Sequence, residues 1–185
     1  AAVLEACGHS ARAHFDAAYD VILPPLAVCA GLGELGRNNI LIADRYGSRV
    51  RIGAVTTDLR LDADSPVSLG ADHFCGLCRK CSDTCPSGAL SGGDKEFIRG
   101  VWKWPTHVER CYAYWRVTGT DCGVCMAVCP FSHRSTWLHT LVRAAVRRFE
   151  WLHPFLLWCD DLVYGRAWRR LPGGRGRASG SGASG

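Results

Sequence analysis

Two runs of cysteines constrain this chain more than any other feature of its sequence. The first has the spacing Cys-x2-Cys-x2-Cys-x3-Cys-Pro and spans residues 75–86; the second ends Cys-x2-Cys-x3-Cys-Pro at residues 122–130 and is preceded by Cys111. In bacterial-ferredoxin spacing, the first three cysteines of a run bind one iron–sulfur cluster and the fourth binds the other. A tight turn presents three thiolates to one face of a cubane, and the x3 step carries the fourth out of reach.

This crossed pattern predicts two 4Fe–4S clusters, which use eight of the eleven cysteines. The expected ligands of the first, here cluster 1, are Cys75, Cys78, Cys81 and Cys129, and those of cluster 2 are Cys85, Cys111, Cys122 and Cys125. The other three cysteines, Cys7, Cys29 and Cys159, fall outside every motif and are predicted to be small buried hydrophobic residues. None of the seven histidines is needed as a ligand when eight thiolates fill two clusters.

Zinc and disulfides explain the cysteines less well. A zinc site calls for pairs of Cys-x2-Cys, and no histidine stands at zinc-finger spacing. A disulfide framework suits small secreted chains that lack other means of stability. This chain of 185 residues is 48% hydrophobic, enough for a core of its own.

The charge of the chain is uneven along its length. Residues 134–185 carry nine arginines against three acidic residues, whereas residues 1–133 are nearly neutral. The longest apolar stretch, residues 21–30, is too short to span a bilayer. The chain has no initiator methionine and shows no signal peptide, so we expect it to be the C-terminal part of a longer protein.

Hydrophobic periodicity gives a coarse secondary structure. It predicts a helix over residues 1–20, a break at Pro24 and Pro25, a short buried strand at 26–30 and a strand at 50–57. Residues 137–152 have helical spacing, and we expect that helix to pack its apolar side on the domain, with Arg143, Arg147 and Arg148 on the other side. A membrane-surface helix is the alternative. The low-complexity residues 172–185 are predicted to be disordered.

Residues 31–36 match the dinucleotide-binding pattern G-x-G-x-x-G. That pattern is weak without a preceding strand, a following helix and an acidic residue at the end of a second strand. Asp58 stands near the required distance, but Gly47 and Ser48 interrupt the unit. The sequence favours a turn that lets the backbone approach a ligand closely, and that ligand need not be a nucleotide.

Taken together, these motifs resemble the C-terminal half of a corrinoid- and iron–sulfur-dependent reductive dehalogenase. The resemblance runs from about residue 20 to 170. Besides the first cysteine run, it is carried by residues 30–37 (AGLGELGR), 46–51 (YGSRVR), 55–59 (VTTDL), 86–90 (PSGAL), 111–115 (CYAYW), 119–133 (GTDCGVCMAVCPFSH) and 160–166 (DDLVYGR).

The resemblance implies an α+β architecture in four parts. Residues 1–72 would be the C-terminal part of an α/β corrinoid-binding core, which is nitroreductase-like in the family. Residues 73–133 would form a bacterial-ferredoxin-like domain with two 4Fe–4S clusters. A helical extension at 134–171 and the tail at 172–185 would follow.

The resemblance also implies an oxidoreductase activity used in organohalide respiration. In that family the clusters relay electrons to a corrinoid of the cobalamin type, and the reaction replaces a carbon–halogen bond by C–H and releases halide. Much of the corrinoid pocket and the proton-donating tyrosine lie upstream in the family. We therefore expect these 185 residues to be inactive alone.

Several residues beyond the cysteines are candidates for this chemistry. Arg37, Arg49 and Arg51 could supply a fixed positive charge beside a leaving halide, and the resemblance favours Arg51 as the catalytic arginine. Strand alternation would place Arg49 and Arg51 on one face. The corrinoid neighbourhood would be formed by Gly31, Gly33, Gly36 and Arg37. Trp115, near Tyr112 and Tyr114, would line a substrate pocket or shield a cluster from water.

Two other functions stay open on the sequence alone. Epoxyqueuosine reductase, a tRNA-modifying enzyme, resembles this chain in the glycine turn and the Thr-Asp-Leu strand, but the nearly neutral residues 1–133 do not favour tRNA binding. A stand-alone ferredoxin-type electron carrier would need neither the glycine turn nor the Arg-Val-Arg segment.

Expected partners are an organohalide, an electron-donor protein or quinol chain and a small membrane-anchor subunit, without nucleic acid. A respiratory member would be exported to the outer face of the bacterial cytoplasmic membrane, and other members would be cytoplasmic.

Overall fold

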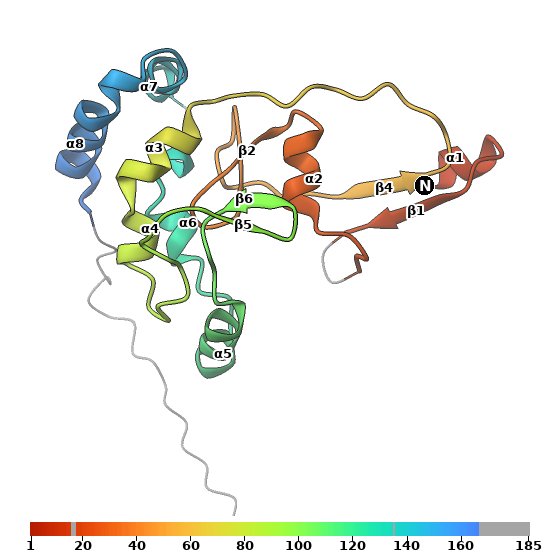
Figure 1. Ribbon diagram of the computed structural model, residues 1–185, viewed down its shortest axis with the longest axis horizontal. Coiled ribbons are helices and arrows are strands. Elements are labelled where there is room, and N and C mark those ends of the chain that lie inside the picture. Colours follow the sequence, from red (N-terminus) through yellow and green to blue (C-terminus); the bar gives the residue numbers. More distant parts are fainter. Residues whose placement is uncertain (16–17, 135, 167–185) are drawn as a thin grey trace, which may run out of the picture.

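The computed structural model describes residues 1–15, 18–134 and 136–166, which form a mixed structure of short helices and small antiparallel sheets. Figure 1 shows a helical body that contains both cysteine runs and an arm that extends away from it. The predicted disordered tail at 172–185 lies outside the described residues. No helix in the described ranges is long and apolar enough to cross a membrane.

The first part of the chain contains two short helices and four strands. In chain order they are α1 (Ala2–Ala6), β1 (Ala11–His14), α2 (Leu23–Cys29), β2 (Gly33–Leu35), β3 (Leu41–Ala43) and β4 (Ala54–Thr57). Strand β1 pairs antiparallel with β4, and β2 pairs antiparallel with β3. The β1–β4 pair forms the arm in Figure 1.

The second part carries the cysteines. Its elements are α3 (Ala71–Cys78), α4 (Lys80–Asp83), β5 (Glu96–Ile98), β6 (Val101–Lys103), α5 (Val108–Thr118), α6 (Val124–Ala127), the 3-10 turn η1 (Pro130–Ser132), α7 (Trp137–Arg148), the 3-10 turn η2 (Glu150–Leu152) and α8 (His153–Tyr164). Strands β5 and β6 form an antiparallel hairpin.

The prediction of one helix over residues 1–20 was wrong, because only α1 is helical among the described residues there. Residues 11–14 instead pair with residues 54–57, from Ala11 opposite Thr57 to His14 opposite Ala54. Buried His14 reinforces this ladder through a 2.9 Å hydrogen bond between its Nε2 and the Thr56 hydroxyl. Pairing with a distant strand overrode the local helical pattern.

The strand predicted at residues 26–30 was also wrong, since those residues lie largely in helix α2. Pro24 and Pro25 do not break a preceding helix but occupy the first turn of α2. Proline suits that position because the first N–H groups of a helix have no intrahelical partner. The strand predicted over 50–57 is confirmed only for its second half, which is β4.

The core surrounds the first cysteine run. Its buried members come from β3, α3, η1, α7, α8 and the segments between them, and they are Ile42, Ala71, Phe74, Cys75, Cys78, Trp104, Cys129, Phe131, Val146 and Leu157. Phe74 packs edge-on against Phe131, with their ring centroids 5.3 Å apart. Three of the four cysteines predicted to bind cluster 1 are therefore part of the hydrophobic core itself.

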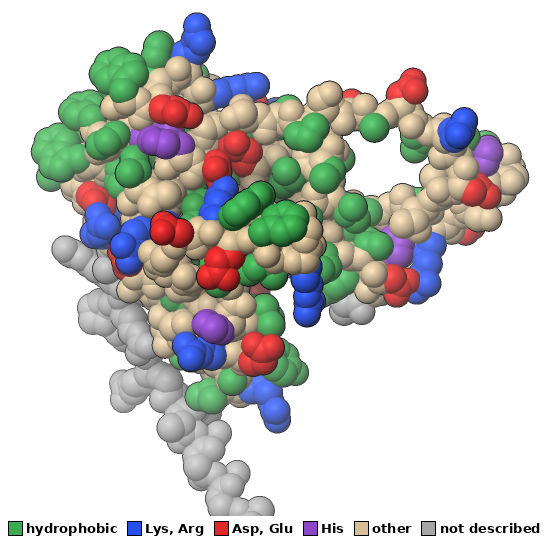
Figure 2. Space-filling model, in the orientation of Figure 1, with side chains coloured by type: hydrophobic (Ala, Val, Ile, Leu, Met, Phe, Trp, Pro, Cys, Tyr) green, Lys and Arg blue, Asp and Glu red, His purple; other side chains and the backbone are tan. Residues whose placement is uncertain are grey.

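The helix predicted over residues 137–152 is confirmed only for residues 137–148, which form α7, and residues 150–152 form the 3-10 turn η2. The predicted orientation of this helix was only partly right. Val146 is buried in the core and Val142 packs beside it, whereas Trp137 remains 76% exposed. Arg143 turns inward, and its guanidinium donates hydrogen bonds to the carbonyls of Phe131 and His133. Hydrophobic side chains gather on the surface over α7 and α8 in Figure 2.

Candidate iron–sulfur centre

The first group of cysteines comes from three neighbouring elements. Helix α3 carries Cys75 and Cys78, and helix α4 carries Cys81. The two helices are separated by Arg79, which has a left-handed φ of 55° and turns the chain between them. Cys129 stands at the N-terminus of η1, far along the sequence.

These four cysteines line one narrow cavity. Ile42, Phe74 and Phe131 form apolar walls of the same cavity. The fold thus brings the fourth cysteine of the second run to the first three cysteines of the first run. This is the grouping expected for cluster 1, although ligation itself stays a prediction.

The second group also gathers residues from both runs. Burial, together with the nearby thiols of Cys122, Cys111 and Cys85, raises the pKa of Cys125 to about 11. Burial likewise raises the pKa of Cys111, with contributions from Cys122 and Cys85. Mutual electrostatic influence of this kind places the four side chains near one another, in the grouping expected for cluster 2.

The environment of the first group disfavours free thiolates. Burial raises the pKa of Cys75 well above its ordinary value, and raises the pKa values of Cys78 and Cys81 to about 12. Buried thiols become stable thiolates when a metal compensates their charge. Four soft sulfur donors around one enclosed space fit an iron–sulfur cluster. Among the described side chains, no group of three or more His, Cys, Asp or Glu residues is arranged for a single metal ion.

Arg37 lies at the first cysteine group. Its side chain is buried, and it donates hydrogen bonds to the carbonyl oxygens of Cys75 at 3.0 Å, Gly76 at 3.2 Å, Ser91 at 3.1 Å and Gly93 at 2.9 Å. Its predicted place in the corrinoid neighbourhood stays a prediction.

The glycines of residues 31–36 are needed by the chain itself. A Cβ atom on Gly33 would lie 2.1 Å from the carbonyl oxygen of Ile42, because β2 and β3 form a tight hairpin. A Cβ on Gly31 would lie 2.6 Å from the carbonyl oxygen of Ser65, and one on Gly36 would meet Ile42. The segment continues into an antiparallel hairpin, so the helix that a dinucleotide fingerprint requires is replaced by strand β3. Their predicted contact with a corrinoid stays untested.

Arg49 and Arg51 are both exposed and precede strand β4, so the strand alternation predicted to align them was wrong. Trp115 is 40% exposed on α5, and Tyr112 on the same helix is 63% exposed. Their roles at a pocket or cluster stay predictions. The prediction that Cys7 and Cys29 are buried was wrong, and Cys159 is only partly buried.

A buried ionic network beside the first group escaped the sequence analysis. The Lys80 side chain is 2% exposed and pairs with Asp160 and with Asp161, the latter at 2.8 Å. The Lys80 ammonium also donates to the Gly165 carbonyl at 3.0 Å, and His133 Nε2 lies 2.8 Å from Asp160 Oδ1. Burial lowers the pKa of Lys80, but its two carboxylate partners outweigh burial, and the net shift is upward. Two features of the sequence could have indicated this network: a lysine between two of the cysteines of the first run, and a pair of adjacent aspartates near the C-terminus.

Comparison with known proteins agrees with this geometry. A family model described as a 4Fe-4S dicluster domain matches residues 74–133. The tetrachloroethene reductive dehalogenase of Desulfitobacterium hafniense is 41% identical over 134 residues, which are 66% of this chain and 24% of that protein. The enzyme of the same name from Sulfurospirillum multivorans is 37% identical over 147 residues, covering 75% of this chain and 29% of that protein.

The chain is homologous to the C-terminal part of the reductive dehalogenases. A solved catabolic reductive dehalogenase superposes with a TM-score of 0.82 at 34% identity, over 90% of this chain and 24% of that one. The chain therefore spans about a quarter of the length of these reductive dehalogenases.

Epoxyqueuosine reductases are more distant. The enzyme from Lactococcus garvieae is 30% identical over 122 residues, covering 58% of this chain and 31% of that protein. A solved epoxyqueuosine reductase from Streptococcus thermophilus has a TM-score of 0.55 at 23% identity, over 72% of this chain and 36% of that chain, which indicates a shared fold alone.

Proposed function

We propose that the protein containing this chain is a reductive dehalogenase, and that this segment relays electrons through two 4Fe–4S clusters to a corrinoid. The observation that carries the proposal is the regrouping of eight cysteines into two interleaved sets of four, within a chain 41% identical to a tetrachloroethene reductive dehalogenase. A solved relative that superposes with a TM-score of 0.82 is a reductive dehalogenase whose structure suggests a mechanism for B12-dependent dehalogenation.

In this proposal, Cys75, Cys78, Cys81 and Cys129 bind cluster 1, and Cys85, Cys111, Cys122 and Cys125 bind cluster 2. Support comes from the shared cavity of the first set and the mutual pKa effects of the second. The two sets are neighbours, since Cys125 contributes to the raised pKa of Cys81 and helix α4 contacts helix α6. Adjacent clusters give electrons a short path between them.

The corrinoid would supply the cobalt centre at which a carbon–halogen bond is reduced. Residues 1–72 would complete its α/β, nitroreductase-like core together with upstream sequence. The shape of the arm supports this proposal, because Figure 2 shows an opening between the β1–β4 arm and the segment that leads back to the body.

Within that core, Arg51 would provide a fixed positive charge near the leaving halide, and Gly31, Gly33 and Gly36 would lie near the corrinoid. Trp115 would line the substrate pocket or shield a cluster from water. The predicted partners are an organohalide, an electron-donor protein or quinol chain and a small membrane-anchor subunit. A respiratory role would place the protein at the outer face of the cytoplasmic membrane.

Substrate conversion tests this function directly. The full-length protein, loaded with clusters and corrinoid and given a low-potential reductant, should release halide from an organohalide such as tetrachloroethene. Ion chromatography measures the halide, and parallel incubation with epoxyqueuosine-containing tRNA should give no queuosine. Conversion of the tRNA without halide release would refute the dehalogenase assignment and leave only the cluster assignment.

A further inference from the structure

Arg37 carries a buried positive charge that the proposed electron relay does not yet explain. Only 3% of the residue is exposed, and its guanidinium lies 4.7 Å from the centroid of the Trp104 ring. Two of its hydrogen bonds go to the carbonyls of Cys75 and Gly76, which belong to the last turn of α3. The last four carbonyls of a helix have no partner within the helix, so Arg37 holds the end of α3 in place.

Its position also brings a permanent charge to the cysteines. Arg37 lines the same cavity as Cys75, Cys78, Cys81 and Cys129. An arginine stays protonated even when it is buried. Electrostatic interactions are stronger in such a water-poor environment than at the surface.

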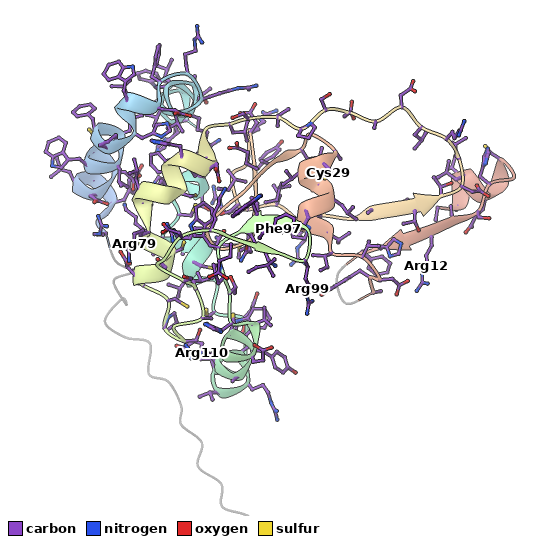
Figure 3. All side chains as sticks on the ribbon, viewed as in Figure 1. Arg12, Cys29, Arg79, Phe97, Arg99 and Arg110 are labelled. Atoms are coloured by element: carbon purple, nitrogen blue, oxygen red, sulfur yellow. The ribbon has the colours of Figure 1, made fainter. Side chains whose placement is uncertain are left out.

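Two other cations line this cavity, and both are compensated. Lys80 is paired with Asp160 and Asp161. Arg79 lies at the junction of α3 and α4 (Figure 3), its side chain is 50% exposed, and Asp83 lies 3.9 Å away. Arg37 differs from both, because within the described part of the chain its hydrogen bonds all go to neutral backbone carbonyls and no carboxylate pairs with it.

A 4Fe–4S cluster with four thiolates is anionic, and reduction adds one more negative charge. A fixed cation nearby stabilises the reduced state more than the oxidised state, which raises the reduction potential. We propose that Arg37 raises the reduction potential of the cluster bound by Cys75, Cys78, Cys81 and Cys129. The inference rests on the proposed cluster ligation and is independent of the organic substrate.

Redox titration of the cluster-loaded chain tests this assignment. Electron paramagnetic resonance, recorded anaerobically at defined potentials, follows the two clusters separately. Arg37→Gln removes the charge, and Arg37→Lys keeps it while losing the planar hydrogen-bonding fork. We expect Arg37→Gln to lower the midpoint of one cluster, Arg37→Lys to restore most of that shift, and Arg79→Gln to change little because solvent screens Arg79.

Iron and sulfide analysis accompanies each titration. An Arg37→Gln protein that holds both clusters with unchanged midpoints would overturn the proposal. Equal shifts in Arg37→Gln and Arg37→Lys would also overturn it, because they would assign the effect to helix positioning and not to charge.

A further variant identifies the affected cluster. Cys129→Ser changes the signal of the cluster that it ligates, which identifies that cluster in the wild-type titration. The proposal requires the midpoint that falls in Arg37→Gln to belong to this cluster, and a shift confined to the other cluster would refute it. If Arg37→Gln does not fold, Arg37→Met, which is also uncharged, takes its place. Because no organohalide is present, a failure here is distinct from a failure to release halide.

Discussion

The buried Lys80 allows a quantitative test of how α8 is held against the cluster domain. Lys80 lies between Cys78 and Cys81, and its partners Asp160 and Asp161 are on α8. The side chains of Lys80 and Asp160 are 2% and 12% exposed, so solvent screens this pair little. We predict that Lys80→Ala strongly destabilises the fold.

The magnitude follows from the burial of the charges. Breaking a buried ion pair by removing one partner destabilises a protein by about 3–5 kcal/mol, because a buried charge is left without compensation. His133 remains within hydrogen-bond distance of Asp160, and Arg166 lies 3.0 Å from Asp161, so the lower part of that range applies. At about 2–4 °C per kcal/mol for a chain of this size, a loss of about 3–4 kcal/mol lowers Tm by roughly 6–16 °C.

Thermal unfolding of cluster-loaded protein, followed by circular dichroism without oxygen, measures this change. Arg12→Ala is the matched control, because Arg12 on the arm pairs with Asp20 at 2.6 Å while its side chain is 70% exposed (Figure 3). Exposed pairs contribute about 0–1 kcal/mol, so the control should shift Tm by less than about 4 °C. Iron content must stay equal in both variants. An equal Tm shift in Lys80→Ala and Arg12→Ala would refute the argument.

Four further predictions concern the cysteines, Arg51, Gly47 and the pH dependence of stability. Reconstitution should give about eight irons and eight sulfides per chain, and Cys129→Ser should damage the cluster of Cys75, Cys78 and Cys81, as EPR can show; a single cluster or bound zinc would contradict this. In the full-length enzyme, Arg51→Ala should remove about 2–4 kcal/mol of transition-state stabilisation and so lower the turnover rate, while the iron content stays unchanged. Unchanged halide release would exclude Arg51 from catalysis. Gly47→Ala should lower Tm far more than Gly100→Ala, because a Cβ on Gly47 would lie 1.7 Å from the Phe131 carbonyl oxygen and one on Gly100 meets nothing within 4 Å. Burial, together with His133 and Arg143, lowers the pKa of His139 in the folded state. Stability should therefore decrease as pH falls through the unfolded pKa of about 6.5. Between about pH 7.5 and pH 6, Tm should fall less in His139→Gln than in the wild type, and an identical fall would contradict this role of His139.

The sequence by itself determined the features that depend on spacing. The cysteine intervals specified which residues gather, because a tight turn can bring only three thiolates to one face and the fourth must come from elsewhere. Apolar residues recur at helical spacing over residues 137–148 and predicted helix α7, since a long periodic pattern indicates a helix without any knowledge of tertiary contacts. The resemblance of the motifs to reductive dehalogenases rested on the same local spacings.

Only the tertiary structure decided where the isolated charges and the short segments lie. Residues 11–14 form a strand because β4 supplies hydrogen-bonding partners forty or more residues away. Arg37 meets the cysteines because the β2–β3 hairpin packs against α3, and Lys80 is buried because α8 returns to supply two carboxylates. No local pattern encodes such contacts, since their free energy comes from groups that are distant in the sequence and adjacent only in the folded chain.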